Sequence, residues 1–304
     1  MIERPHDVIV IGLGAMGSAA VYHLSRRGYR VLGLEAFGRG HERGSSHGRS
    51  RITREAYNEA REYVSLVRRA NALWSALAEE SGRSLFVETG GLNIGRPEAT
   101  LVSGSLAAAK AENILHEYLT AAEVNARFPA YRLPDGFMAV YEPKAGLLYP
   151  EVCTAAHLDR AASLGADLHF DEPVRRWVAD GSGVRVETGR ATYWADRLVI
   201  AAGPWAGEVL SDLGLPLEVW RILHVHFEPD SEDRFSVGRC PWAMWDVSEG
   251  VYAAFTALPG DGVKFGRHDV GEVCTPDSAR RGVEDAEVET LRQRLNAFMP
   301  GAGG

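Results

Sequence analysis

The chain has 304 residues and a formal net charge of −8, with 45% hydrophobic and 24% charged residues, which is typical of a globular protein. Its acidic balance argues against nucleic-acid and membrane binding, since both need a broad positive surface. The three cysteines lie far apart without metal-ligand spacing, so neither a zinc site nor a disulfide framework is predicted. No apolar run of membrane-spanning length or signal-peptide pattern occurs, which favours a cytoplasmic protein.

The first predicted elements alternate between strand and helix. Residues 7–12, DVIVIG, form a β-branched run typical of a strand buried on both faces. Residues 15–28 have helical spacing, and residues 30–35 form a second strand. A polar, glycine-rich loop follows from residue 38 to about 50, and a helix is expected over 61–82. The N-terminal part therefore predicts a βαβ unit.

The remainder of the chain predicts a mixture of sheet and helix. Sheet is expected at 86–95 and a helix at 101–114. A second helix is expected at 150–165, followed by strands at 166–170, 185–188 and 195–203. Beyond residue 215, three segments indicate an antiparallel sheet, at 225–229, 252–258 and 263–268. Together these elements predict an α/β fold.

A glycine fingerprint lies between the first strand and the first helix. Gly12, Gly14 and Gly17 form G-x-G-x-x-G, which provides a tight turn, close approach to a pyrophosphate, and close packing of helix on strand. Glu35, at the end of the second strand, is placed to accept hydrogen bonds from a ribose and disfavours NADP. The alternative is a glycine-rich turn that binds nothing. The pattern favours an ADP-containing dinucleotide.

The order of the elements favours FAD over NAD. An NAD domain usually continues in regular βαβ alternation, whereas this chain enters a long polar loop and returns near residue 146. The strand at 195–203 ends in small residues that would let a cofactor approach, although an ordinary buried strand would look similar. We therefore expect a discontinuous FAD-binding domain and an inserted substrate domain. Their predicted ranges are 1–85 and 146–214 for the first, and 86–145 and 215–304 for the second.

Residues 44–57, GSSHGRSRITREAY, concentrate basic side chains in an acidic chain. These side chains are His47, Arg49, Arg51 and Arg54. A guanidinium group can hold a carboxylate through two parallel charge-assisted hydrogen bonds. The alternative is a solvated basic loop whose arginines pair with nearby glutamates. From the residues alone, the solvated loop is the favoured interpretation, and Arg49 fits it best.

Six segments together resemble the monomeric sarcosine oxidase and N-methyltryptophan oxidase family of D-amino-acid-oxidase-like flavoenzymes. They are DVIVIGLGAMGSAA, SSHGRSRITREAYNEAREYVSL, ETGGLNIG, EPKAGLLYPE, VIAAGPWAGEVL and VKFGRH. The resemblance runs from Asp7 to the C-terminus. It implies a Rossmann-like FAD domain with an inserted antiparallel-sheet substrate domain, in a monomer. It further implies oxidation of a secondary amine, an N-methyl amino acid, with oxygen as acceptor and hydrogen peroxide as product.

The resemblance also implies roles for individual residues. Arg54 would hold the substrate carboxylate, Arg51 would stabilise negative charge near the flavin, and Lys264 would activate oxygen. His268 would contact the substrate and Tyr57 would line its pocket. The cofactor-binding residues implied are Gly12, Gly14, Ala15, Met16, Gly17, Glu35, Ser46, His47, Arg51, Val174 and Gly203. No metal site is expected.

Alternation along GVKFGRH predicts a strand with Lys264, Gly266 and His268 on one face. An exposed lysine and a surface histidine are the alternatives for this segment, and a packed tyrosine is the alternative for Tyr57. Ala253 stands where the sarcosine-specific pattern has a tyrosine, so we expect a substrate bulkier than sarcosine.

The family pattern continues beyond Gly304 with a strand that carries the flavin-linking cysteine. The resemblance therefore implies a C-terminally truncated chain, and neither Cys240 nor Cys274 stands at the linking position, so covalent attachment is not assigned. Two other functions stay open. One is a related oxidase that deaminates a primary or cyclic amino acid, and the other is a flavin-binding remnant without catalysis.

Overall fold

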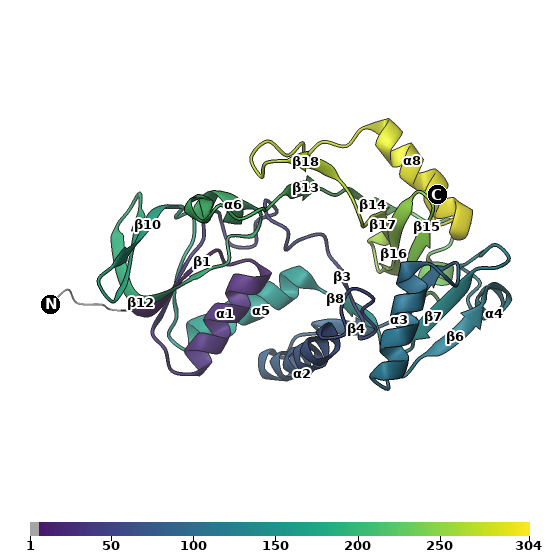
Figure 1. The fold of residues 1–304 in the computed structure, drawn as a ribbon, viewed down its shortest axis with the longest axis horizontal. Coiled ribbons are helices and arrows are strands. Elements are labelled where there is room, and N and C mark those ends of the chain that lie inside the picture. Colours follow the sequence, from purple (N-terminus) through teal and green to yellow (C-terminus); the bar gives the residue numbers. More distant parts are fainter. Residues whose placement is uncertain (1–5) are drawn as a thin grey trace.

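Two large β-sheets with a small sheet between them organise residues 6–304, the part of the chain that the computed structural model describes (Figure 1). The strands of the first sheet are β1 (His6–Ile11), β2 (Val31–Leu34), β9 (Asp167–His169), β10 (Val174–Asp180), β11 (Gly183–Thr188) and β12 (Thr192–Ile200). Their order is β10-β11-β12-β1-β2-β9. The four strands from β12 to β9 are parallel, and β10, β11 and β12 form an antiparallel meander.

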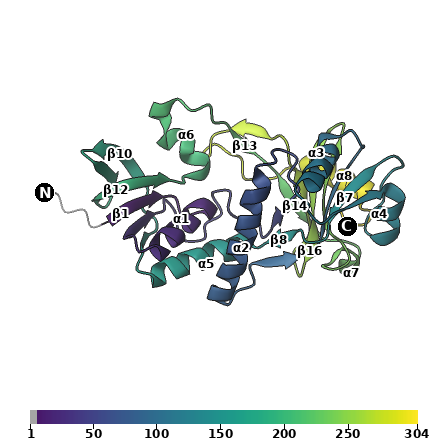
Figure 2. The same ribbon diagram turned by 60° about the horizontal axis from the view of Figure 1, so that its bottom comes forward.

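Strand β1 is buried on both faces because its side chains alternate between two hydrophobic clusters. Val8 and Val10 pack with three helices, namely α1 (Ala15–Arg26), α2 (Tyr63–Ser81) and α5 (Pro150–Ser163). Ile9 and Ile11 pack on the opposite face against the antiparallel meander. Figure 2 shows the three helices gathered on one side of the sheet. Burying one such side chain stabilises the folded state by about 1.5–3 kcal/mol, so β1 contributes strongly to the stability of the first sheet.

The second sheet contains seven strands. They are β5 (Gly91–Gly95), β6 (Glu117–Thr120), β7 (Met138–Glu142), β14 (His224–Phe227), β15 (Trp242–Val247), β16 (Gly250–Leu258) and β17 (Gly262–Arg267). Their order is β14-β17-β16-β15-β5-β7-β6. The predicted antiparallel arrangement holds for every pair except β5 and β15, which are parallel. This pair can be parallel because a long stretch of chain, rather than a hairpin, connects its strands.

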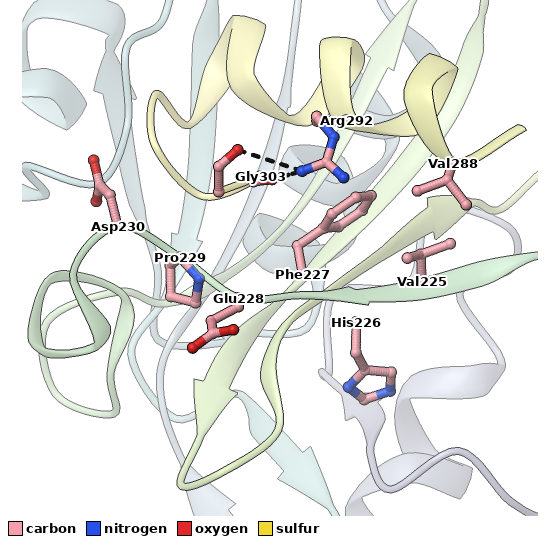
Figure 3. Close-up of a pocket in the computed structure, with 10 residues that line it drawn as sticks. Val225, His226, Phe227, Glu228, Pro229, Asp230, Val288, Arg292 and Gly303 are labelled. Atoms are coloured by element: carbon pink, nitrogen blue, oxygen red, sulfur yellow. Dashed lines mark hydrogen bonds between the residues drawn. The ribbon is translucent and has the colours of Figure 1, made fainter. Parts of the chain in front are cut away.

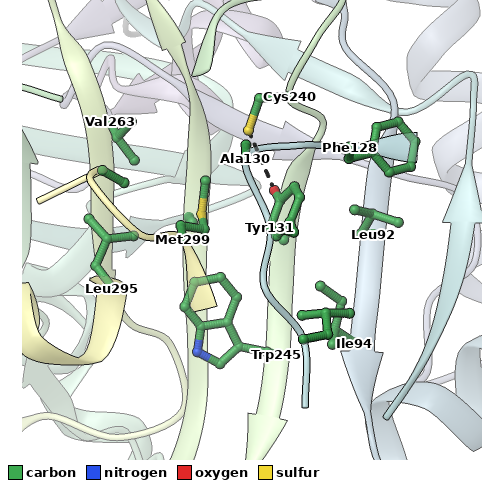
Figure 4. Close-up of a cluster of buried hydrophobic side chains, with 14 of the residues drawn as sticks. Leu92, Ile94, Phe128, Ala130, Tyr131, Cys240, Trp245, Val263, Leu295 and Met299 are labelled. Carbon is green, nitrogen blue, oxygen red and sulfur yellow. Dashed lines mark hydrogen bonds between the residues drawn. The ribbon is translucent and has the colours of Figure 1, made fainter. Parts of the chain in front are cut away.

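One face of the second sheet is covered by α8 (Asp285–Phe298) (Figure 1). Figure 4 shows the buried cluster at this interface, where Leu295 and Met299 lie near Trp245. The Trp245 ring stacks on Phe265 with ring centroids 5.3 Å apart. Buried Tyr131 donates a hydrogen bond of 2.6 Å to the Pro241 carbonyl, so its polar end is satisfied inside the core.

The small sheet joins the two large ones. Its strands are β3 (Arg51–Thr53), β4 (Phe86–Glu88) and β8 (Gly146–Leu148), in the order β3-β8-β4. The sheet predicted at 86–95 is confirmed as two strands, because the chain turns at Gly90 and places β4 and β5 in different sheets. Gly90 has φ +70°, and a Cβ there would lie 2.7 Å from the Tyr141 hydroxyl, so the turn requires glycine.

The remaining elements are short or lie at the rim. They are α3 (Thr100–Ala111), α4 (Ala121–Arg127), α6 (Ala206–Val209), α7 (Glu232–Phe235), a ribbon of β13 (Val219–Arg221) and β18 (Glu272–Cys274), and 3₁₀ turns at Gly203–Trp205 and Ser211–Leu213. Within residues 6–304, no helix is both long and apolar enough to cross a membrane.

Candidate cofactor and substrate site

A cavity of about 1320 Å³ opens at the carboxyl ends of β1, β2 and β12. This is the edge where open α/β sheets bind ligands. Its volume exceeds the roughly 300–1,000 Å³ of ordinary small-molecule sites and suits a dinucleotide. Most of the predicted cofactor residues line it, namely Gly12, Gly14, Ala15, Met16, Glu35, Ser46, Arg51, Val174 and Gly203.

Two predicted cofactor residues, Gly17 and His47, are not part of this lining. A Cβ at Gly17 would lie 1.7 Å from the Gly12 carbonyl oxygen, so this glycine lets α1 pack against the end of β1. That is the packing role expected of the third glycine in the fingerprint. His47 is half-buried in the loop before β3.

The glycine turn and the start of α1 form a cradle for an anion. Gly12 has φ +88°, and a Cβ there would lie 2.4 Å from the Ala201 carbonyl oxygen. Gly14 begins the helix, and the Ala15 N–H donates to the Ser46 hydroxyl at 2.9 Å. The positive end of α1 therefore faces the cavity, where it would hold a pyrophosphate. These features fit an FAD molecule.

Glu35 is fixed at the end of β2. One carboxylate oxygen accepts the Leu13 N–H at 2.8 Å and the other accepts the Phe37 N–H at 3.2 Å. His41 Nε2 lies 3.3 Å from the same carboxylate. The carboxylate thus stands beside the glycine turn in the position that a ribose hydroxyl would require.

A second cavity of about 500 Å³ lies between β14 and α8 (Figure 3). Val225, Phe227 and Arg292 line it, and the Arg292 guanidinium donates to the Gly303 carbonyl. None of the site residues predicted in the described chain lines this cavity. The larger cavity is therefore the candidate site.

Lys264 is buried on β17 beside the loop at residues 44–50, which precedes β3, so the exposed-lysine alternative is wrong. Its Nζ donates to the carbonyls of Gly48 and Ser50 at 2.9 and 2.8 Å, and lies 4.2 Å from the centroid of the Phe255 ring. Burial, together with the positive charge of Arg51, lowers the pKa of Lys264 to about 7. This amine therefore changes charge near neutral pH.

Arg51, at the start of β3, lines the cavity next to Lys264. Its Nη1 donates to the Ser50 carbonyl at 2.8 Å and its Nη2 to the Ser45 carbonyl at 2.6 Å. Burial lowers the pKa of Arg51. Arg51 and Lys264 thus share the Ser50 carbonyl, and two cations meet at one side of the cavity.

Arg54 is only 5% exposed, although it belongs to the predicted basic loop. Its Nη1 contacts Met244 Sδ at 2.8 Å, and its Nη2 pairs with Glu59 at 3.2 Å, as the solvated-loop alternative predicts. Its guanidinium lies 4.5 Å from the Tyr57 ring centroid. The buried Nε of Arg54 has no hydrogen-bond partner within the described residues. A buried donor left unpaired is costly, so this Nε is available to a hydrogen-bond acceptor.

His268 follows the end of β17 and is exposed, as the surface-histidine alternative predicts, in contrast to buried Lys264. Although the residue as a whole is exposed, its imidazole ring is partly buried, which lowers the pKa of His268, and the nearby positive charge of Arg54 lowers it further. The histidine therefore lies within the electric field of Arg54. Tyr57, Arg54 and His268 form one group, and Lys264 with Arg51 forms another.

Three residues at the site were not among the predicted site residues, although Glu151 ends the segment EPKAGLLYPE. Glu151, near the start of α5, accepts the N–H groups of Gly48 and Arg49. Thr154 lines the cavity with a buried hydroxyl that has no partner in the described chain. His224 pairs across β14 and β17 with Gly266, and burial with the charge of Lys264 lowers its pKa to about 3. Only the folded topology brings these residues to the loop.

Residues 7–304 match the model of a family described as FAD dependent oxidoreductase. The chain belongs to this family, which confirms FAD as the cofactor and the predicted fold class. The resemblance predicted from sequence is likewise confirmed. Monomeric sarcosine oxidase of Streptomyces avermitilis is 44% identical over 98% of this chain and 79% of the relative.

Two other proteins extend the comparison. N-methyl-L-tryptophan oxidase of Yersinia pestis is 32% identical over 98% of this chain and 80% of the relative. The solved structure of NikD, an unusual amino acid oxidase essential for nikkomycin biosynthesis, superposes with a TM-score of 0.82. It is 26% identical and covers 98% of this chain and 79% of NikD. These are similarities of sequence and fold to enzymes that oxidise amino compounds.

Proposed function

We propose that this enzyme oxidises the secondary amine of an N-methyl amino acid, with oxygen as the final acceptor and hydrogen peroxide as a product. The observation that carries the proposal is the buried Arg54, whose unpaired Nε can complete a fork for a carboxylate. Bound FAD would supply the redox chemistry, by taking a hydride equivalent from the carbon attached to nitrogen and passing two electrons to oxygen. The imine product would then be hydrolysed by water.

The residues around Arg54 would orient the substrate. Arg54 would hold the carboxylate, and the Tyr57 ring stacked against it would exclude water from that contact. Because its pKa is lowered, His268 is neutral at pH 7, and its free ring nitrogen would accept a hydrogen bond from the substrate amine. Arg51 and protonated Lys264 would provide the positive field for charge that develops during the reaction.

Ala253 supports a substrate larger than sarcosine. On neighbouring strands it pairs with Met244 and Gly266, and the Met244 sulfur contacts Arg54. The small side chain of Ala253, beside Met244 on the neighbouring strand, leaves room next to the proposed carboxylate site. Substituting Ala253→Tyr should lower kcat/KM for bulky N-methyl amino acids more than for sarcosine. Equal losses for all substrates would contradict this assignment.

A substrate panel tests the proposed function. The purified protein is mixed anaerobically with N-methyl amino acids of increasing size, and bleaching of the flavin absorbance is recorded. Oxygen is then admitted and peroxide is measured. A primary amino acid and proline serve as probes for the deaminating alternative, and an amine without a carboxylate tests the Arg54 assignment. Absence of bleaching by every N-methyl amino acid would refute the proposal.

We further propose that residues 1–85 and 146–214 form the cofactor domain and that 86–145 and 215–304 form the substrate domain. The division is supported by the first large sheet, whose strands all lie between His6 and Ile200, outside 86–145. The monomeric state and the cytoplasmic location stay predictions from the sequence.

A further inference from the structure

Residues 48–50 form an unusual turn immediately before β3. Gly48 has φ +100° and Arg49 has φ +66°, so two successive residues adopt the left-handed region. The Ser50 N–H also donates to the Gly48 carbonyl at 2.8 Å, which closes the turn. Because arginine rarely adopts positive φ, contacts from elsewhere in the fold must hold this conformation.

Glu151 supplies the contacts to the N–H groups of the turn. Its Oε1 accepts the Gly48 N–H at 2.7 Å and the Arg49 N–H at 3.0 Å. Glu151 lies in the first turn of α5, where the helix dipole favours a negative charge. Although burial raises it, these N–H donors and the Arg51 charge hold the pKa of Glu151 below its ordinary value. The carboxylate therefore stays ionised.

The carbonyls of the same turn hold the two cations of the site. Lys264 donates to the carbonyls of Gly48 and Ser50, and Arg51 donates to that of Ser50. A third contact comes from Asp261, which pairs with the Arg49 side chain at 2.5 Å. The turn thus presents its N–H groups to Glu151 and its carbonyls to Lys264 and Arg51.

We propose that Glu151 is a positioning residue, which fixes the turn at residues 48–50 so that its carbonyls orient Lys264 and Arg51 at the cofactor cavity. The inference rests on the proposed function only for what the two cations do in catalysis. The hydrogen-bond geometry of the turn is independent of it. Without Glu151, the two N–H groups lose their acceptor, the turn relaxes toward ordinary dihedral angles, and both cations lose carbonyl partners.

Two substitutions separate the hydrogen bonds of Glu151 from its charge. Glu151→Ala removes the acceptor oxygen, whereas Glu151→Gln retains an amide oxygen that can accept both N–H groups. Glu123→Ala is the matched control, because Glu123 also accepts a backbone N–H near a helix start, in α4, away from the cavity. The three variants and the wild type are purified with their flavin.

Trypsin cleavage after Arg49 reports the turn without depending on activity. The Arg49 side chain is 68% exposed, so cleavage there is limited by the backbone conformation. We expect cleavage at this bond to be about tenfold faster in Glu151→Ala, and near the wild-type rate in Glu151→Gln and Glu123→Ala. In stopped-flow experiments, Glu151→Ala should also slow flavin reoxidation by oxygen more than flavin reduction by substrate.

Wild-type cleavage and reoxidation rates in Glu151→Ala would overturn the inference. Equal defects in Glu151→Ala and Glu151→Gln would also overturn it, since charge rather than hydrogen bonding would then be responsible. If no amine reduces the wild-type flavin, the proposed function fails, and the cleavage rates alone decide whether Glu151 holds the turn.

Discussion

Replacing Arg54 by methionine tests the proposed carboxylate site most directly. Methionine keeps an unbranched chain beside Met244 but removes every donor of the guanidinium. The Glu59 partner is 45% exposed, so water can solvate the carboxylate left behind. The fold should therefore survive the substitution, and the loss should fall on substrate binding and turnover.

The expected magnitude follows from the two hydrogen bonds that a carboxylate would receive. A hydrogen bond to a charged group contributes about 1.5–3 kcal/mol, so two contribute at least about 3 kcal/mol. Losing them should lower kcat/KM for an N-methyl amino acid about 150-fold. Arg54→Lys retains the charge but only a point donor, and should cost about tenfold.

The assay compares kcat/KM for an N-methyl amino acid and for the corresponding amine without a carboxylate. Arg54→Met should collapse the preference for the first substrate and leave the second nearly unchanged. Arg68→Met is the control, since Arg68 is an exposed arginine that pairs with Glu55 on the protein surface. Equal losses for both substrates in Arg54→Met would refute the carboxylate site.

Three further predictions concern the lysine, the fingerprint and a buried histidine. Because the pKa of Lys264 is lowered to about 7, its cationic form is lost as pH rises through 7, so flavin reoxidation should slow above that pH in the wild type but show no such dependence in Lys264→Met. Gly17→Ala forces a Cβ to 1.7 Å from the Gly12 carbonyl oxygen, and the purified variant should lack flavin absorbance. Burial lowers the pKa of His157 from 6.5 to about 4. Between pH 6.5 and 4 the unfolded state therefore binds a proton that the folded state does not. Acidification through this range should cost about 3 kcal/mol of folding stability. Urea unfolding at pH 7 and 4.5 should show this loss, and His157→Phe should reduce it.

The elements that could be predicted from sequence are those whose signals are local. The strand at 7–12, the helix after it and the glycines that join them carry their own periodicity and turn chemistry. The helix predicted at 61–82 likewise corresponds to α2, which ends at Ser81 and is capped by Gly82 with φ +65°. Such signals need no knowledge of distant residues.

What could not be predicted depends on contacts across the fold. Strands β3, β4 and β8 have three residues each, too few to show alternation, and are defined by pairing with one another. Arg49 faces solvent as expected, but its ion pair with Asp261, more than two hundred residues further along the chain, could not be predicted. Glu151 reaches the loop in the same way. No local pattern records such partners.

The small sheet has a consequence for how the molecule unfolds. In the small sheet, Ile52, Val87 and Leu147 pack against Trp242 and Phe255 of the second large sheet. The next residue of β8, Leu148, packs against the hydrophobic cluster of the first large sheet, so the small sheet ties the layer that binds FAD to the layer that carries Lys264. Neither layer can separate without exposing these side chains to water. We therefore expect a single cooperative unfolding transition rather than two, and access to the cavity must come from movement of its loops rather than from rotation of one half against the other.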